Sequence, residues 1–242
     1  MKYKTKNFNL DNVCVFLPIR KGSKRIKNKN VKLFFGKPII YYSLKILKKS
    51  KIFDKIIVST NSDLIEKISI KFGADRVIRR PDYISSNKVG TISVINHSIK
   101  SLSKLKIYPK FICCMYPVAP ITKFKNLILV YNWIKKMKKI NGFIYPSTIL
   151  LKKKNQTKIK FNYNKLIQAY KINKKDGIIN DVLLDAGQFW FAKTSTWKKS
   201  KTIYTKKSHT FLIDEKISDI NSISDWKKVK KIYRDNRKKY IS

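Results

Sequence analysis

The sequence predicts an α/β fold in which a mostly parallel sheet carries helices on both faces. Between residues 13 and 147, apolar runs of strand length alternate with amphipathic helical segments, and the connections between them are short. The first run, residues 13–17, is unbroken, which is typical of a parallel strand buried on both faces. Any single run of this kind also fits a buried helix, and the regular alternation is what favours strands.

Local signals place the boundaries of the next elements. The first helix is expected at residues 38–50, since Pro38 has no N–H to leave unpaired in a first turn. Ser62 caps the second helix, Asp63 complements its N-terminal dipole, and Gly73 ends it. Two more helices are expected at residues 91–105 and 124–138, and four more strands at residues 55–60, 76–80, 110–116 and 142–147.

The C-terminal part is less regular. Residues 148–181 are polar, show only short alternations and lack a helical pattern, so we expect a hairpin or flap that leaves the main sheet. Residues 183–193 return to a strand. The last helix starts at Ser222, which forms a capping pattern with Asp225. No linker interrupts the chain, so residues 1–242 are expected to form a single domain.

The charge balance first suggests a polyanionic partner. The chain of 242 residues has 56 Lys and Arg against 14 Asp and Glu, a formal net charge of +42. A nucleic-acid interface should be a local basic stripe, whereas these lysines occur along the whole chain together with many Ile and Asn residues. All three residue types have A/T-rich codons. Base composition therefore explains the charge, and we expect no specific nucleic-acid partner.

Composition also bounds the compartment. No apolar run approaches the ~20 residues of a membrane span, and the polar start contains no signal-peptide core. The three cysteines, Cys14, Cys113 and Cys114, lie within apolar runs, and the adjacent pair should point to opposite faces of a strand. We interpret them as core residues, and we expect a cytoplasmic protein with no membrane partner.

The basic stretch LPIRKGSKRIKNKN, residues 17–30, follows the first strand. In an open α/β sheet, ligands bind beyond the carboxyl ends of the strands. Backbone N–H groups around Gly22 and Ser23, with cationic side chains beside them, would form an anion nest. The stretch lacks the spacing of a P-loop. Three other unusual segments lie at such ends, namely residues 59–63, 116–120 and 185–190.

The same stretch carries a family resemblance. The CMP-sugar synthetases have R-x-G-S-K-x-x-x-x-K-N after an apolar strand, and this chain has the pattern complete. Its fixed positions here are Arg20, Gly22, Ser23, Lys24, Lys29 and Asn30. The similarity continues through FGKPIIYYSL, FDKIIVSTNSD, RRPDYISSNKVGT and DINSISDW, and so spans nearly the whole chain. It implies a three-layer Rossmann-like nucleotidyltransferase fold, a homodimer, and transfer of CMP from CTP to an acidic sugar with release of pyrophosphate.

Three segments resemble one branch of that family, the pseudaminic acid cytidylyltransferases: CCMYPVAP, DAGQFWF and DIN. The resemblance implies a nine-carbon nonulosonic acid as acceptor, with pseudaminic acid first, for glycans of the cell surface or flagellin. CMP-N-acetylneuraminate and CMP-legionaminate synthesis stay open, as does another sugar nucleotidyltransferase. A nucleic-acid-binding protein is the distant alternative.

The resemblance also implies roles for single residues. Arg20, Gly22, Ser23 and Lys24 would hold the triphosphate, with Arg20 and Lys24 acting on the leaving group. Lys29 and Asn30 would complete the nucleotide site, Arg80 would join Asn30 on the base or ribose side, and Thr91 would face cytosine. Tyr116 would lie near the reacting centre, and Asp185 and Gln188 would contact the sugar. Asp219 would bind Mg²⁺ or Mn²⁺ and act in catalysis, with Asn221 as a second ligand.

Each role has a simpler alternative. Arg80 also fits an ion pair with Asp82, Tyr116 fits ordinary packing, Asp219 fits the start of a turn, and residues 185–190 fit a core strand with a bulge at Gly187. The chain also departs from the branch. Two segments where the branch has arginine near the sugar carboxylate, residues 148–158 and 175–189, contain none here. Lysine supplies charge there but not a bidentate fork.

Overall fold

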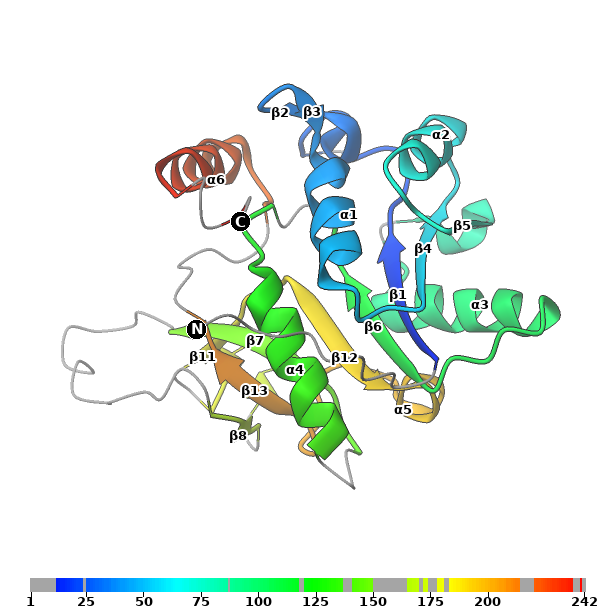
Figure 1. Ribbon diagram of the computed structural model, residues 1–242, viewed down its shortest axis with the longest axis vertical. Coiled ribbons are helices and arrows are strands. Elements are labelled where there is room, and N and C mark those ends of the chain that lie inside the picture. The colour runs from blue at the N-terminus through cyan, green and yellow to red at the C-terminus, as the bar shows by residue number, and fades with distance from the viewer. Residues whose placement is uncertain are drawn as a thin grey trace.

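The structure is a computed structural model of the chain, shown in Figure 1. It describes residues 12–23, 25–86, 88–117, 120–136, 141–149, 165–169, 172–173, 178–180, 183–213, 220–236 and 240. The helices are α1 (Ile39–Ser50), α2 (Asp63–Lys71), α3 (Thr91–Lys104), α4 (Phe124–Lys136), α5 (Thr194–Lys199) and α6 (Ile223–Asp235). Two short 3₁₀ turns are η1 (Lys29–Val31) and η2 (Asp82–Ile84).

One mixed sheet forms the centre of the molecule. Its longer strands are β1 (Val13–Pro18), β4 (Lys55–Thr60), β5 (Arg76–Arg79), β6 (Phe111–Met115), β7 (Ile144–Ile149), β11 (Leu183–Asp185), β12 (Phe189–Lys193) and β13 (His209–Leu212). Strands β5, β4, β1 and β6 are adjacent and parallel, while β12 runs antiparallel between β6 and β7. A separate pair is formed by β2 (Leu33–Phe34) and β3 (Lys37–Pro38).

Helices cover both faces of this sheet, so the predicted three-layer α/β fold is confirmed. One core cluster joins β1 to the apolar faces of α1, α2 and α4, and the other joins it to α3 and α5. Cys113 lies in the first cluster and Cys114 in the second, because successive side chains of a strand alternate between faces. All three cysteines are buried and free, as expected of core residues.

The run at residues 183–193 is a strand with a bulge. Asp185 pairs with Ser147 of β7 and Phe191 pairs with Ile144. A step of six residues in this run is therefore matched by a step of only three residues in β7. Gly187, with φ of +63°, lies in the bulge and separates β11 from β12. Bulges of this kind redirect side chains, and this one lies beside the carboxyl end of β6.

Residues 148–181 differ from the predicted flap where they are described. Three short strands, β8 (Ile167–Gln168), β9 (Ile172–Asn173) and β10 (Ile178–Ile179), extend the sheet through β13 and β11. These segments form strands because their backbone N–H and C=O groups pair with an open edge of the sheet. Residues 150–164 lie outside the described part, so the flap's role stays a prediction.

A third core cluster fixes α6 near the basic stretch. Trp226, Val229 and Tyr233 of α6 are buried and pack with Ile26 and Phe34. The capping pattern at the start of α6 is also confirmed: the Ser222 hydroxyl accepts from the Asp225 N–H, and the Asp225 carboxylate accepts from the Ser222 N–H. Among the described residues, no helix combines the length and hydrophobicity that crossing a membrane requires.

Candidate functional site

A cavity of about 570 Å³ opens at the carboxyl ends of the parallel strands. It brings together most of the residues singled out in the sequence. Those that line it are Arg20, Ser23, Lys29, Asn30, Arg80, Thr91, Tyr116 and Asn221. Gly22 instead lines an adjoining hollow of about 300 Å³, which shares Arg20, Ser23, Lys29 and Asn30. Lys24 and Asp219 lie outside the described residues.

The basic stretch forms one wall of the cavity, and internal bonds hold it in a compact loop. The Asn30 amide donates to the Arg20 carbonyl at 3.2 Å, which closes the loop on itself. Gly22 has φ of +78°, a left-handed conformation that a side chain would strain. Lys29 donates to the Ile220 carbonyl at 2.7 Å and so ties the loop to the turn before α6. The loop therefore presents cationic groups from a fixed backbone.

Arg80 lines the cavity from a position immediately after β5, where its backbone N–H donates to the Thr60 carbonyl at 2.8 Å. The side chain is only 5% exposed, and Nε and Nη2 have no hydrogen-bond partner among the described residues. Burial, and then the positive charge of Arg20, lower the pKa of Arg80 to about 10. The guanidinium group thus stays charged at neutral pH, and the ion pair with Asp82 considered above is not formed.

Two hydroxyl groups meet on the side of the cavity formed by α3 and β6. Thr91, the first residue of α3, and Tyr116, which follows β6, place their hydroxyl oxygens 2.9 Å apart. The Tyr116 ring packs edge-on against Trp190 of β12, with ring centres 4.7 Å apart. Packing therefore fixes the ring, and its hydroxyl stays at the cavity wall.

Asp185 and Gln188 flank the bulge, and neither is among the residues that line the cavity. The buried Asp185 carboxylate accepts hydrogen bonds from the Gly187 N–H, the Trp190 indole and the Tyr204 hydroxyl at 2.8, 2.9 and 2.8 Å. Burial and the charge of Asp185 raise the pKa of Tyr204. Among the described residues, Asp185 therefore stabilises the bulge. Its predicted contact with the sugar stays a prediction.

Gln188 is different from Asp185. Its side chain is 2% exposed, and neither amide atom has a hydrogen-bond partner among the described residues. The backbone carbonyl of Gln188 accepts from the Tyr116 N–H at 3.0 Å. Gln188 therefore lies next to Tyr116, which lines the cavity. A buried amide without partners costs about 1–3 kcal/mol, which a substrate group able to pair with it would recover.

The predicted metal turn is described from Ile220 onward. The Asn221 N–H donates to the Asp225 carboxylate at 3.0 Å, while its Oδ1 is buried without a partner and the residue lines the cavity. An unpaired amide oxygen of this kind suits a hard cation such as Mg²⁺. The described residues contain no cluster of three or more His, Cys, Asp or Glu side chains. Among the described residues the donor at this turn is one neutral amide oxygen, so an ion bound here would be completed largely by substrate and water oxygens.

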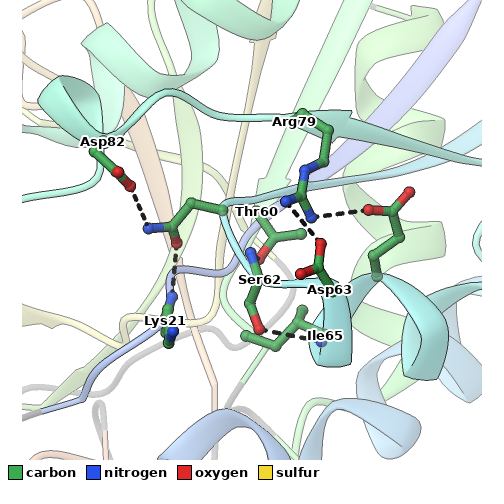
Figure 2. A network of polar contacts seen from close by, with 9 residues as sticks. Lys21, Thr60, Ser62, Asp63, Ile65, Arg79 and Asp82 are labelled. Carbon is green, nitrogen blue, oxygen red and sulfur yellow. Dashed lines mark hydrogen bonds and ion pairs between the residues drawn. The ribbon is translucent and has the colours of Figure 1, made fainter.

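Sequence reasoning missed other residues of the cavity wall, including Arg25 and Ser86. Both lie inside segments that carried the resemblance, but neither belongs to its fixed motif positions. Their place inside those segments was the available signal. Figure 2 shows a further network that sequence reasoning did not foresee, in which Lys21 and Asp82 lie on either side of the turn after β4.

Comparison with known proteins agrees with this geometry. A family model described as Cytidylyltransferase matches residues 14–176. The pseudaminic acid cytidylyltransferase of Campylobacter jejuni is 28% identical over 235 residues, which cover 94% of this chain and 98% of that protein. The N-acylneuraminate cytidylyltransferase of Escherichia coli is 29% identical over 116 residues, 48% of this chain and 26% of that protein.

Solved structures extend the likeness to the fold. The structure of CMP:2-keto-3-deoxy-manno-octonic acid synthetase aligns with a TM-score of 0.67 and 10% identity, over 93% of this chain and 99% of that one. The 4-diphosphocytidyl-2C-methyl-D-erythritol synthase of Anaerococcus prevotii aligns with a TM-score of 0.58 and 11% identity, over 92% and 98%. At these identities the likeness shows the shared fold alone.

Proposed function

Because this chain belongs to the cytidylyltransferase family, we propose that it transfers CMP from CTP to the anomeric hydroxyl group of a nonulosonic acid, with pseudaminic acid as the first candidate. Pyrophosphate is the second product. The C. jejuni relative supports this choice of sugar, since the likeness extends over nearly the full length of both chains. The N-acylneuraminate relative matches about half of this chain and supports the same class of acceptor.

The observation that carries the proposal is the environment of Arg80. An arginine that is 5% exposed, faces Arg20 and has two unpaired nitrogens is costly in the free protein. An anionic ligand in the cavity repays that cost by pairing with both cations. CTP is such a ligand, and a cavity of about 570 Å³ is of the size that small-molecule sites have.

The reaction places its charge where these cations lie. The anomeric oxygen forms a bond to the α-phosphorus of CTP, the bond from that phosphorus to the bridging oxygen breaks, and the hydroxyl proton passes to solvent. Negative charge collects on the departing pyrophosphate. Arg20, Ser23 and Lys24, with Lys29, would stabilise this charge from a preorganised loop. Gly22 would let the backbone approach the phosphates.

The remaining nucleotide contacts follow from positions around the same cavity. Asn30 and Arg80 would hold the base or ribose side, and Thr91 would face cytosine. The Thr91 and Tyr116 hydroxyl groups are within hydrogen-bond distance of each other, so one can donate to the other and leave a lone pair or proton for a ligand. Tyr116 would thereby link the base side to the reacting centre.

A divalent cation is part of the proposal, with Asp219 and Asn221 as its protein ligands. When bound, Mg²⁺ or Mn²⁺ supplies electrostatic stabilisation of the phosphates. Asn221 offers a neutral oxygen, so free-ion affinity should be low and should rise with nucleotide present. Calorimetry of Mg²⁺ into the protein, with and without a non-hydrolysable CTP analogue, tests this, and equal affinity in both titrations would contradict it.

The sugar would lie beyond Tyr116, towards Gln188. We propose that the Gln188 amide, which has no partner among the described residues, pairs with a polar substituent of the sugar, and that Asp185 supports the bulge that carries it. The branch arginines near the sugar carboxylate are absent from this sequence, so the acceptor is the least constrained part of the proposal. A panel of nonulosonic acids is therefore the appropriate assay.

We also propose that residues 1–242 act as a single domain in a homodimer, with residues 148–181 contributing to the contact or covering the sugar site. The family resemblance supports this proposal. Analytical ultracentrifugation at micromolar protein and moderate salt is the direct measurement. A monomer alone would contradict the dimer and leave the enzymatic proposal standing.

Pyrophosphate release tests the function itself. We expect it to require CTP, Mg²⁺ and a nonulosonic acid together, and to be fastest with pseudaminic acid among N-acetylneuraminic, legionaminic and pseudaminic acids. The matched arm titrates CTP and duplex DNA over a salt series. DNA affinity should fall steeply with salt, as for any polycation. Absence of turnover with every sugar, combined with DNA binding that is tighter than CTP binding at moderate salt, would overturn the proposal.

A further inference from the structure

The segment at residues 59–63, which spans the end of β4 and the start of α2, has no role in the proposed function. Asn61 lies within it. Its side-chain Oδ1 accepts a hydrogen bond from the Lys21 backbone N–H at 2.9 Å, and its Nδ2 donates to the Asp82 carboxylate at 3.0 Å. Figure 2 shows Lys21 and Asp82 at the two ends of this pair of bonds. A single amide group therefore joins two segments that are far apart in the sequence.

These two segments both contribute to the wall of the cavity. Lys21 lies between Arg20 and Gly22 in the basic loop. Asp82 starts η2, two residues after Arg80, in the segment that leads to Thr91. Both walls supply lining residues, so their spacing sets the width of the nucleotide site. Asn61 comes from a third element, the turn between β4 and α2, and bridges them from the adjoining hollow, which it lines together with Lys21 and Gly22.

Electrostatics explains why such a bridge is needed. Arg20 and Arg80 carry like charges on the two walls, and the charge of Arg20 disfavours the protonated form of Arg80. Without a ligand, this repulsion pushes the walls apart. A neutral amide holds them without adding a carboxylate that would compete with the substrate. The same bond directs the Asp82 carboxylate towards Asn61, and Arg80 is left unpaired for the ligand.

We propose that Asn61 is a positioning residue that sets the spacing of the two cavity walls before CTP binds. The identity of the ligand rests on the proposed function, whereas the bridge is a property of the free protein. A preorganised site spends less binding energy on ordering its loops. Loss of the bridge should therefore raise KM for CTP more than it lowers kcat.

An exchange of donor and acceptor tests the bridge. Asn61→Asp keeps an acceptor for the Lys21 N–H but sets a carboxylate against that of Asp82, so KM for CTP should rise about fivefold with kcat within about twofold. The double variant N61D/D82N restores the geometry, because the introduced amide donates to the introduced carboxylate. Its KM should return to within about twofold of wild type. Asp63→Asn, which removes a neighbouring carboxylate outside the bridge, is the charge control.

Amide hydrogen exchange in the ligand-free protein gives a readout that does not depend on catalysis. The Lys21 N–H should exchange faster in Asn61→Ala, and the double variant should restore its protection. If wild-type protein binds no CTP, the proposed function fails while this exchange measurement still decides on the bridge. If wild-type protein binds CTP, but Asn61→Asp keeps its KM or N61D/D82N fails to recover, the positioning role is wrong.

Discussion

Two neighbouring arginines at the end of β5 lie in opposite environments. Arg79 is half-exposed and forms ion pairs with Asp63 and Glu66 of α2 at 2.8 and 2.9 Å (Figure 2). Arg80 is buried, and two of its nitrogens have no partner among the described residues. An exposed ion pair contributes little to stability, whereas a buried charge without a partner costs free energy. The fold therefore pairs the arginine that gains little free energy from pairing, and leaves two nitrogens of the buried arginine without a partner among the described residues.

The same contrast recurs around the bulge. Asp185 is a buried carboxylate with three hydrogen-bond donors, and its neighbour Gln188 is a buried amide with no partner. Residue type alone does not separate the two, since both were expected to contact the sugar. What separates the two side chains is whether the fold supplies them with hydrogen-bond partners. The polar group with partners stabilises the bulge, whereas the polar group without partners is the one we propose to pair with a substrate.

The largest expected effect sharpens the contrast between the arginines. Arg80→Met should lower kcat/KM for CTP about a thousandfold, roughly 4 kcal/mol, because it removes a buried cation that pairs with the nucleotide. Arg79→Met should stay within about twofold. Steady-state pyrophosphate release measures both. Comparable losses in the two variants would show that burial and pairing do not separate them.

Asp185 should matter for folding more than for substrate affinity. Asp185→Ala should lower the free energy of unfolding by about 3 kcal/mol, since three buried donors lose their acceptor. Urea denaturation followed by circular dichroism gives this value. The KM for the sugar, measured on the folded fraction, should change less than in Gln188 variants. A stable protein with a large rise in sugar KM would reverse the assignment.

Gln188→Leu is the complementary change. It removes an unsatisfied amide while keeping apolar volume, so we expect stability to be unchanged or slightly higher and the KM for the sugar to rise about tenfold, roughly 1.4 kcal/mol. Initial rates measured at saturating CTP give the KM for the sugar alone. Gln188→Glu is a useful second variant because it retains an acceptor. An unchanged sugar KM in both variants would remove Gln188 from the site.

The smallest expected effect concerns stability without substrate. Arg80→Met removes the desolvation penalty of an unpaired charge, so the free energy of unfolding should rise by about 1 kcal/mol without ligand. Added CTP should raise the melting temperature of the wild type but not that of the variant. Differential scanning fluorimetry over a CTP series measures both quantities. A variant less stable than wild type would mean that Arg80 also supports the fold.

Much of the fold was predictable because its signals are local. The unbroken apolar strands, the Ser62 cap and the Ser222–Asp225 capping box each depend on a few neighbouring residues. Other features depend on distant pairing. His209 begins β13, where it pairs with Ile144, and the short strands β8 and β10 pair with β13 and β11.

The site was predictable only as a set of motif positions. The loop motif predicted several residues that line the cavity. It could do so because the spacing of these residues along the chain suits the nucleotide that they would hold. It gave no signal for Asn61, whose contacts join residues 40 and 21 positions away. It also could not show that Asp185 is saturated while Gln188 is not, because hydrogen-bond satisfaction depends on Trp190 and Tyr204 in the folded chain.

The attachment of α6 links the end of the chain to the cavity. The Asp225 carboxylate accepts from the Asn221 N–H, and Lys29 donates to the Ile220 carbonyl, so the last helix and the turn before it share bonds with the basic loop. If α6 opens by local unfolding, Asn221 leaves the cavity wall with it. Ligand binding and the packing of α6 against the loop are therefore energetically coupled, and each stabilises the other. A bound nucleotide would slow proteolysis near the C-terminus, at sites that no ligand atom contacts.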